Sequence, residues 1–534
     1  MKKVVLIICI LFCQITSFCQ GMVSLNDFGW RNAKSGAARA KVLYEAQTEA
    51  IKKGTVVDYS GIAVIDLEIT SDFKSIPLSG KDDFRGIIFN VKNNAKDVFL
   101  FTLLQRSKSI KLSKKILDGT SFLSVPELQK GEYLLIIEDK QPWVDNRLGY
   151  DYGHTRKDIL LIKDGRGVNT VVAPYDNMES NPSCTYCPVN PGGSYIKNFI
   201  LNRVSGSQYK TRCVDIKGQG HILIENVTIK TPKSNLTGDY AIRIQDCVDV
   251  VLKDIVIDGS YSSSSKYGYG ININNAWKTR MENVKGHGEW GVMGNNNMSD
   301  VSLINCEINR FDIHCYGRNV FLSDCTIDGG EKGWYCGGSS IFGVIQFDRC
   351  YFTNCVPLSY GDSYKTAVGA DVVFNDCIFK VTKKRHSVFS TSVLETASNP
   401  RRGLSQKDLP NIEINRMKII VPAGVKEVYL YDVGDKPPTE KQVGYLKKIK
   451  IRDMEINTEN GTPDVSFSFF SSPINTLNAL SIEIQGLNAP GVSINPKVSI
   501  NNRNKVRIRR SNLKSVKEGQ SNLRVKIRNS KIGK

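Results

Sequence analysis

The apolar positions of this chain follow two different periods. Over residues 37–53 they recur at helical spacing and Gly54 follows at the C-cap position, which predicts one short amphipathic helix. Elsewhere the apolar runs are short and separated by Asn, Asp and Gly, as is typical of strands and turns. The first of these predicted strands cover residues 55–59, 86–91, 97–104, 133–138 and 159–163.

From about residue 195 one phrase recurs along the chain. A β segment is followed by Asn, Asp or a similar residue, then by an apolar residue or Cys, then by a second short β step. Clear copies lie roughly 19–29 residues apart, the range of solenoid repeats. Short strands with little helix between them predict an all-β parallel β-helix, in which successive coils pair about 4.8 Å apart. The repeated residues are Asn198, Asn226, Asp254, Asn283, Asn305, Asp324, Arg349 and Asp376, with weaker copies at Met417, Met454, Leu487 and Leu513.

The cysteines follow the same repeat. Four occupy one register, which predicts an inward ladder of small buried thiols; they are Cys306, Cys325, Cys350 and Cys377. Three of the 14 cysteines precede residue 20, and the remaining 14 − 3 = 11 is an odd number that argues against a fully paired disulfide framework. For the isolated pair Cys184 and Cys187 we expect a local disulfide or two free thiols, and no zinc, because no further ligands stand at matching spacing.

Length, charge and the N-terminus narrow the class of protein. The 534 residues exceed one ordinary globular core and fit an elongated repeat. Lys2 and Lys3 precede an apolar run over 4–12, which predicts a signal peptide over 1–20 and an exported protein, periplasmic, on the cell surface or secreted. The expected organisation is then a cap with first coils over 21–194 and repeats with basic last coils over 195–534. The net charge of +19 favours a polyanion, and export favours an acidic polysaccharide over nucleic acid; no later segment predicts a membrane span.

The opening segment 25–29, the early helix and the Asn/Asp–Cys coils together resemble the right-handed parallel β-helix proteins of the pectate-lyase-like superfamily. The resemblance covers residues 25 to about 530 and implies a right-handed parallel β-helix with a short N-terminal capping helix. It also implies a glycan-active protein of the exported bacterial polysaccharide lyase type. The superfamily includes lyases, hydrolases, epimerases and tailspikes, so the resemblance is weak evidence for any one reaction.

Five matching strand segments predict a polar strip on one outer face. Because alternate residues of a strand face opposite ways, an inward apolar column leaves two outward columns. The inward column is Val214, Ile242, Ile271, Val292 and Ile313; the outward columns are Asp215, Arg243, Asn272, Met293 and His314, and Lys217, Gln245, Asn274, Asn295 and Tyr316. The alternative interpretation is a solvated face with stacked asparagines.

This strip carries the predicted chemistry. His314 and Tyr316 stand two apart on one strand, so either can serve as general base and the other as general acid, with Arg318 close behind. The residues expected to bind a carboxylated sugar are Lys217, Arg243, Asn272, Asn274 and Asn295, together with His287 and Trp290 of an adjacent corner loop. A plain turn is the competing interpretation of that loop, and the loop around His154 is a further candidate.

Three functions compete. A lyase acting on a uronic-acid glycan such as a glycosaminoglycan needs a neutralised carboxylate, a base and an acid, and the strip offers all three. A glycoside hydrolase needs two carboxylates at defined separation, and only Asp215 and Asp312 are obvious on the strip. A non-catalytic glycan-binding protein needs neither. Calcium as a cofactor is left open, although no compact Asp cluster marks a calcium loop; the chain is expected to be a monomer.

Overall fold

The computed structural model describes residues 21–533 apart from nineteen internal stretches of chain. The segments outside the description are 1–20, 96–97, 114–121, 145–153, 172–181, 205–210, 231–239, 259–268, 287–290, 331–334, 339–340, 361–369, 392–410, 433–442, 445–447, 460–463, 472–474, 477–479, 496–503, 518–522 and 534. The predicted signal peptide therefore lies outside the described residues.

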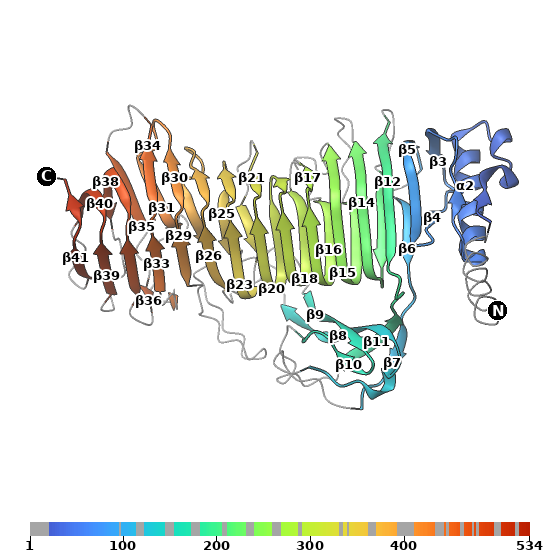
Figure 1. The fold of residues 1–534 in the computed structure, drawn as a ribbon, viewed down its shortest axis with the longest axis horizontal. Coiled ribbons are helices and arrows are strands. Elements are labelled where there is room, and N and C mark those ends of the chain that lie inside the picture. Colours follow the sequence, from blue (N-terminus) through green and yellow to red (C-terminus); the bar gives the residue numbers. More distant parts are fainter. Residues whose placement is uncertain are drawn as a thin grey trace, which may run out of the picture.

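The fold is a right-handed parallel β-helix, as predicted, and its coils stack along one axis (Figure 1). Each coil contributes to three strand faces, here named A, B and C in chain order. Face A consists of β4 (Ile76–Pro77), β6 (Val98–Leu104), β13 (Thr211–Lys217), the first parts of β15 (Tyr240–Asp258), β16 (Tyr269–Glu282), β18 (Gly291–Ile304) and β20 (Phe311–Ser323), then β22 (Tyr335–Gly338), β25 (Val356–Tyr360), β28 (Ser387–Thr391), β31 (Glu427–Asp432), β35 (Val465–Phe470) and the end of β38 (Asn488–Asn495).

Faces B and C complete each coil. Face B consists of the first parts of β5 (Lys81–Asn93), β12 (Ser194–Arg203) and β14 (Gly220–Lys230), the later parts of β15, β16, β18 and β20, then β23 (Ile341–Asp348), β26 (Asp371–Asn375), β29 (Ile412–Asn415), β33 (Lys448–Arg452), β37 (Ser481–Gln485), β39 (Asn504–Arg509) and β41 (Leu523–Arg528). Face C consists of β3 (Val64–Ile69), the ends of β5, β12, β14 and β15, then β17 (Lys285–Gly286), β19 (Glu307–Ile308), β21 (Thr326–Asp328), β24 (Tyr351–Thr353), β27 (Ile378–Lys380), β30 (Lys418–Val421), β34 (Glu455–Thr458), the start of β38, β40 (Asn512–Val516) and β42 (Lys531–Ile532).

The repeated Asn or Asp residues stand at the corner between faces B and C. There the backbone turns through the left-handed region, with φ of 54° at Asn226 and 52° at Asn305, a conformation that Asn and Asp tolerate better than most residues. Their side chains form a ladder from coil to coil; Asn305 Nδ2, for example, donates to Asn283 Oδ1 at 2.7 Å. One later corner is Gly486, where an added Cβ would lie 2.2 Å from Asp453 Oδ1. The repeat in the sequence is therefore the signature of this turn.

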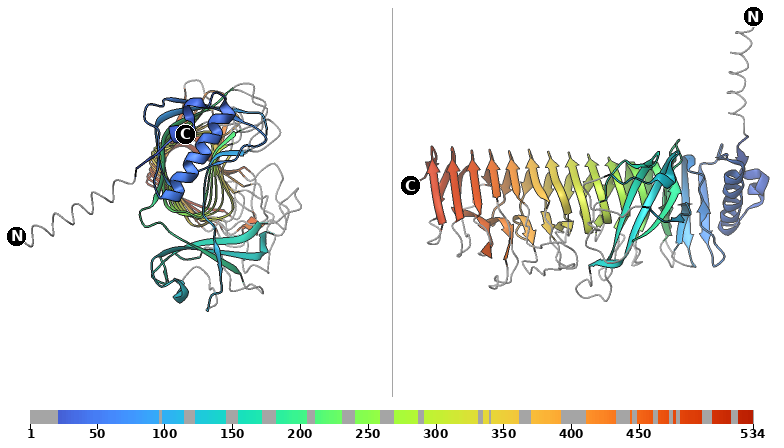
Figure 2. Two further views of the ribbon diagram at one scale, coloured as in Figure 1. Left: turned by 90° about the vertical axis from the view of Figure 1, so that its right-hand side faces the viewer. Right: turned by 90° about the horizontal axis from the view of Figure 1, so that it is seen from below.

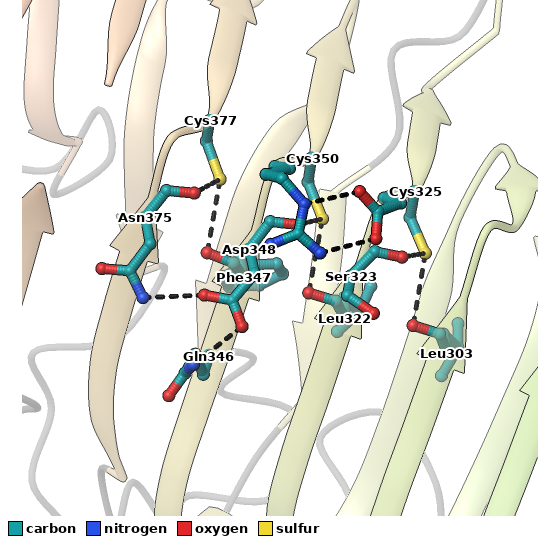
Figure 3. Close-up of polar contacts among 12 residues, drawn as sticks. Leu303, Leu322, Ser323, Cys325, Gln346, Phe347, Asp348, Cys350, Asn375 and Cys377 are labelled. Atoms are coloured by element: carbon teal, nitrogen blue, oxygen red, sulfur yellow. Dashed lines mark hydrogen bonds and ion pairs between the residues drawn. The ribbon is translucent and has the colours of Figure 1, made fainter. Parts of the chain in front are cut away.

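The predicted cysteine ladder is confirmed one residue beyond these corners. Cys306, Cys325, Cys350 and Cys377 are all buried inside successive coils. Each thiol lies within hydrogen-bond distance of a carbonyl of the preceding coil, as Cys350 Sγ does to the oxygen of Leu322 at 3.5 Å (Figure 3). The thiols are free, so this column stabilises the solenoid by packing and weak hydrogen bonds rather than by disulfides.

The predicted helix is also confirmed. Helix α2 (Gly36–Lys53) begins after Ser35, whose hydroxyl accepts from the Ala38 amide, and ends at Gly54 with φ of 66°. It lies across the N-terminal end of the solenoid and packs against β3 and β4 (Figure 1). Its polar interruption, Gln47, is fully buried and donates to Tyr59 Oη at 2.9 Å. The remaining short elements are β1 (Val23–Ser24) with β2 (Val57–Asp58), β32 (Val443–Gly444) with β36 (Asn475–Thr476), and 3-10 turns at Leu25–Phe28, Trp30–Asn32 and Pro126–Leu128.

An antiparallel sheet, which the sequence analysis did not predict, is inserted at the turn between β6 and β12. Its strands run in the order β10 (Arg166–Gly167), β9 (His154–Lys163), β8 (Glu132–Val144), β11 (Ser183–Pro188) and β7 (Lys108–Ile110). One of its faces packs on Val248 and Trp277 of the solenoid, with Leu134, Ile136 and Leu161 in the contact. The sheet projects from one side of the solenoid beside β15, β16 and β18 (Figure 2).

Candidate functional site

A row of polar residues crosses face A in register. Lys217 pairs with Gln245, Gln245 with Asn274, Asn274 with Asn296, and Asn296 with His314. Four strand spacings of about 4.8 Å give this row a length of roughly 19 Å. Lys217 is exposed, and Gln245 and Asn274 are half-buried. We call these five residues the polar row.

The register corrects the predicted strip from β18 onward, where Met293 and Phe311, rather than Val292 and Ile313, continue the column of Ile271. Asn295 was expected beside Asn274, but it pairs with Ile273 and Ile313, which belong to the apolar set. His314 was expected in the column of Arg243, and it stands instead in that of Lys217.

The reason is that Met293 pairs with Ile271 and Phe311, which shifts the alignment of β18 by one residue. Tyr316 was expected to pair with Asn295. It lies within a local irregularity, because the pairing steps from Asn296 with His314 directly to Met298 with Gly317. An extra residue of this kind re-aims the side chains around it, so a uniform alternation does not extend to Tyr316.

A second row lies beside the first and contains Asp215, Arg243, Asn272, Gly294 and Asp312. Arg243 binds Asp215 through two hydrogen bonds, Nε to Oδ1 at 2.9 Å and Nη2 to Oδ2 at 2.6 Å. Its guanidinium also lies 4.6 Å from the centre of the Phe99 ring. The charge predicted to meet a substrate carboxylate is thus already matched by a carboxylate of the protein.

Asn272 is nearly covered, with 4% of its surface exposed, and its Oδ1 accepts from Asn274 Nδ2. Of these two predicted contacts, Asn274 is therefore the more accessible. Asp312 at the other end of the second row is also 4% exposed; it accepts from Tyr269 Oη at 2.7 Å and pairs with Arg310. Tyr269 and Arg310 were not predicted as part of the site, because Tyr269 comes from a distant coil and Arg310 directly precedes the strand.

The inserted sheet borders the polar row at the turn between faces A and B. Lys217 Nζ lies 3.9 Å from Asp246 Oδ2, and Lys157 Nζ of β9 lies 3.7 Å from Asp246 Oδ1. Arg318 Nη1 donates to Thr170 Oγ1 at 3.0 Å, so this predicted site residue contacts the segment that follows β10. Lys217 and Arg318, at opposite ends of the row, are thereby linked to the same border.

His221 of β14 joins the inserted sheet to the solenoid at a second place. His221 Nδ1 lies 2.7 Å from Asp249 Oδ2, and His221 Nε2 lies 3.0 Å from Glu132 Oε2 of β8. Burial by itself would lower the pKa of His221, but the hydrogen bonds and charges of Asp249 and Glu132 outweigh it and raise the pKa above 6.5. Lys278 and Lys163 in turn contact Asp249 and Glu132 at 2.9 and 3.2 Å. This contact is a structural link and was not predicted.

Several predicted residues lie outside the description. His287 and Trp290 belong to the segment 287–290, which the structure does not describe. For Asn295, Asn296 and His314 the strand register is known and the side chains are not described; the same holds for His154 at the start of β9. Tyr316 lies in β20 at the irregularity, and its side chain is not described either. The proposed roles of these side chains therefore stay predictions.

Cys184 and Cys187 are free thiols, and both are buried. They lie three residues apart on β11 and so point to opposite sides of the inserted sheet, one into each of its two apolar layers. The local disulfide that we expected as one outcome is therefore absent, because the thiols face away from each other. Burial raises the pKa of each thiol to about 11.

Among the residues that the structure describes, no group of three or more His, Cys, Asp or Glu side chains is arranged to hold a metal ion. In the same part of the chain, no helix is long and apolar enough to cross a membrane.

A separate groove of about 370 Å³ lies on face B between β26, β29 and β33, and its lining includes Glu413, Lys448 and Lys450. Its Lys450 and Glu413 pair with each other at 3.2 Å, so these two charges are internally compensated.

Comparison with known proteins yields no family. No family model and no curated protein sequence matches the chain. Among solved structures, the tailspike gp54 of Acinetobacter baumannii bacteriophage AP22, in complex with A. baumannii capsular saccharide, is 11% identical, with 96% of this chain and 80% of that chain covered and a TM-score of 0.48. The tailspike gp49 of Pseudomonas phage LKA1 is 12% identical, with 88% and 82% covered and a TM-score of 0.47. Likenesses of this size assign no function to the chain.

Proposed function

We propose that the chain is an exported polysaccharide lyase of the pectate-lyase-like type, which cleaves an acidic, uronic-acid-containing glycan by β-elimination. A glycosaminoglycan is the proposed substrate class. The observation that carries the proposal is the polar row, in which a lysine, three amides and a histidine share one strand position over successive coils. A row of this form suits a linear polymer laid across the strands.

The proposed elimination gives each residue of the site a role. A base removes the proton from C5 of the uronate, the C4–O4 bond breaks, a double bond forms between C4 and C5, and an acid protonates the departing oxygen. His314 and Tyr316 share the roles of base and acid, and Arg318 stabilises the charge that develops on the carboxylate. Asn274 and Asn296 donate hydrogen bonds to the carboxylate, with Asn296 replacing Asn295 in this role.

Lys217 binds an acidic group at the far end of the row, where its side chain is exposed. Arg243 and Asn272 act from behind the row: they hold Asp215 and Asn274 in place and shape the surface on which the glycan lies. His287 and Trp290 remain proposed contacts from the corner loop. The protein is proposed to act as a monomer.

The separation of the two carboxylates on the strip favours elimination over the hydrolase alternative. Asp215 and Asp312 stand four strands apart in the second row, or about 19 Å, whereas hydrolases hold their carboxylates roughly 5–9.5 Å apart. Both are also engaged by arginines. A non-catalytic glycan-binding protein would share the row but form no product.

The test is to incubate the purified protein with a panel of uronic-acid glycans and to follow ultraviolet absorbance of the new conjugated double bond. Absorbance should rise for at least one glycan and should be abolished by His314→Ala. The matched control is His386→Ala, since the His386 ring lies at a tilt against the Tyr429 ring, beyond the strands of the polar row. Chain shortening without absorbance would establish hydrolysis, and binding without shortening would establish the non-catalytic alternative. Repeating the assay with EDTA tests whether calcium is needed.

A further inference from the structure

The last two coils carry an unusual arrangement of charge on face B. In β39 the outward residues are Lys505, Arg507 and Arg509, and the residues between them are buried. The next strand, β41, pairs Arg524 with Lys505, Lys526 with Arg507 and Arg528 with Arg509. Six cations therefore form a grid, two strands wide and three positions long, with spacings of about 4.8 Å across and 6.8 Å along the strands. We call these six residues the cationic grid.

In the described earlier coils of face B, no cation is paired directly with a cation on the neighbouring strand. Glu413 of β29 pairs with Lys450 of β33 at 3.2 Å, and Glu483 of β37 contacts Lys448 and Arg507 at 3.3 Å each. In this central column acid and base alternate up to β39, and in the two flanking columns Ser481 and Gln485 separate the cations of β33 from those of β39. Within the described part of the chain, Arg507 is the one member of the cationic grid with a carboxylate in salt-bridge distance.

Like charges directly opposite each other on neighbouring strands are unfavourable. Cations on a terminal strand can also discourage edge-to-edge pairing, which would account for β41 alone. That explanation does not extend to β39, because β39 is paired on both sides, with β37 and with β41. Among the described residues, five of the six cations lack a carboxylate partner, and two of these five stand on the interior strand β39, which favours an external anion.

We propose that the cationic grid is a second binding surface, for a linear acidic glycan that carries repeated carboxylate or sulfate groups. Arginine binds such groups in a bidentate manner, and three of the four exposed corners of the grid are Arg509, Arg524 and Arg528. The outward positions of β39 and β41 include no aromatic residue, whereas single-stranded nucleic acid is held by stacking on aromatic side chains.

The cationic grid is remote from the polar row. Six strand spacings separate β20 from β39 along face B, or about 29 Å, and the two surfaces belong to different faces. Figure 1 shows β39 and β41 at the C-terminal end, well beyond β20. The cationic grid therefore anchors a long chain without taking part in the reaction, and the proposal holds whether or not the polar row performs an elimination.

The experiment compares the triple variant Arg509→Gln, Arg524→Gln, Lys526→Gln with a control of equal charge change at the opposite end. The control is Lys41→Gln, Lys52→Gln, Lys53→Gln, because these exposed lysines lie on α2. Binding of a heparin oligosaccharide is measured by calorimetry at several salt concentrations, in a His314→Ala background so that no glycan is consumed. Circular dichroism verifies that both variants fold.

We expect the triple variant to bind at least about tenfold more weakly in 0.15 M salt and with a smaller salt dependence, and the control to stay within about twofold of the parent. Equal affinity of the triple variant and the control would overturn the proposal. So would binding of a twenty-residue oligo(dT), or of phosphatidylserine vesicles, that is tighter than heparin binding and is lost in the triple variant. With His314 intact, the triple variant should cleave short oligosaccharides at the parent rate, so loss of anchoring and loss of catalysis are separately visible.

Discussion

The corner between faces B and C and the polar row on face A use the same residue types for different purposes. At the corner, Asn and Asp are selected by the backbone, since φ is positive there, and their side chains bond to the corner of the neighbouring coil. On face A the backbone is extended, so any residue fits, and the polar side chains are not required by the fold. The difference teaches that an asparagine ladder is structural where φ is positive and a candidate for binding where φ is not.

The largest expected difference between the corner residues and the residues of face A is in turnover. His314→Ala and Tyr316→Phe should each lower turnover by at least about a hundredfold, as loss of a general acid or base typically does. The melting temperature should stay close to that of the parent, because neither residue is a corner residue. Measuring initial rates by absorbance alongside thermal melts checks both statements. If both variants keep near-normal activity on the true substrate, the chemistry lies elsewhere, with the loops around His287 and His154 as the next candidates.

A pair of arginine–aspartate contacts makes the comparison quantitative. Arg243→Ala leaves Asp215, whose side chain is 10% exposed, without its bidentate partner, so we expect a loss of about 1–3 kcal/mol in the free energy of unfolding. The corresponding corner contact between Arg349 and Asp324 is exposed, at 58% and 45%.

Arg349→Asn, which suits the positive φ of that corner, should therefore change the free energy of unfolding by less than about 0.5 kcal/mol. Denaturant titrations measure both variants. Equal losses would show that burial on face A does not set the strength of the Arg243 contact.

The corner itself is tested by Asn305. Asn305→Ala should destabilise the protein by about 1–2 kcal/mol. The left-handed conformation is strained for alanine, and the hydrogen bond to Asn283 is lost. Asn305→Gly removes the same bond without that steric cost and should lose less than about 1 kcal/mol. Activity should be unchanged in both. If alanine and glycine are equivalent, the hydrogen-bond ladder rather than the backbone explains the repeated asparagine.

The smallest expected effect concerns the link through His221. The pKa of His221 is raised in the folded protein. Its contribution to the free energy of unfolding is therefore complete below about pH 6.5 and declines as the pH rises through the pKa of the folded state. Burial raises the pKa of Asp249, but hydrogen bonds from Lys278 and His221 lower it overall, so its own contribution is lost only on acidification below about pH 4.

Hydrogen exchange in β8 should therefore be faster at pH 9 than at pH 6.5, after correction for the intrinsic rate. His221→Asn, which suits the positive φ of this position, should remove that difference. A difference that persists in the variant would place the pH-sensitive group elsewhere.

The sequence predicted the solenoid because its corner is local: positive φ, an Asn or Asp and an inward Cys or apolar residue all fall within three positions. It predicted the helix over 37–53 for the same reason. It did not predict the inserted sheet as a sheet, although the strands over 133–138 and 159–163 were expected, because antiparallel pairing joins segments that no short repeat relates. Asp215 and Arg243 were predicted as neighbours in one outward column, but their ion pair was not predicted, because Arg243 was assigned to the substrate instead.

The register of face A was predicted through β16 and then failed. The coils there differ in length, and the irregularity near Tyr316 adds a residue. Gly317 follows it directly, and a glycine inside a strand often marks a bulge, but the matching of apolar residues does not use this signal. Strand register follows from backbone geometry over several coils, so matching short segments by their apolar residues loses the alignment wherever one coil is shortened.

The inserted sheet changes how the solenoid can come apart. In a simple repeat protein each coil contacts only its neighbours, so stability spreads along one dimension and unfolding can start anywhere. Here the insertion reaches His221, Asp246, Trp277 and Arg318 on four different coils and acts as a splint across them. We expect the splinted coils to open as one cooperative unit and the coils beyond β20 to fray independently. A glycan held on the cationic grid would then brace the end of the solenoid that has no splint.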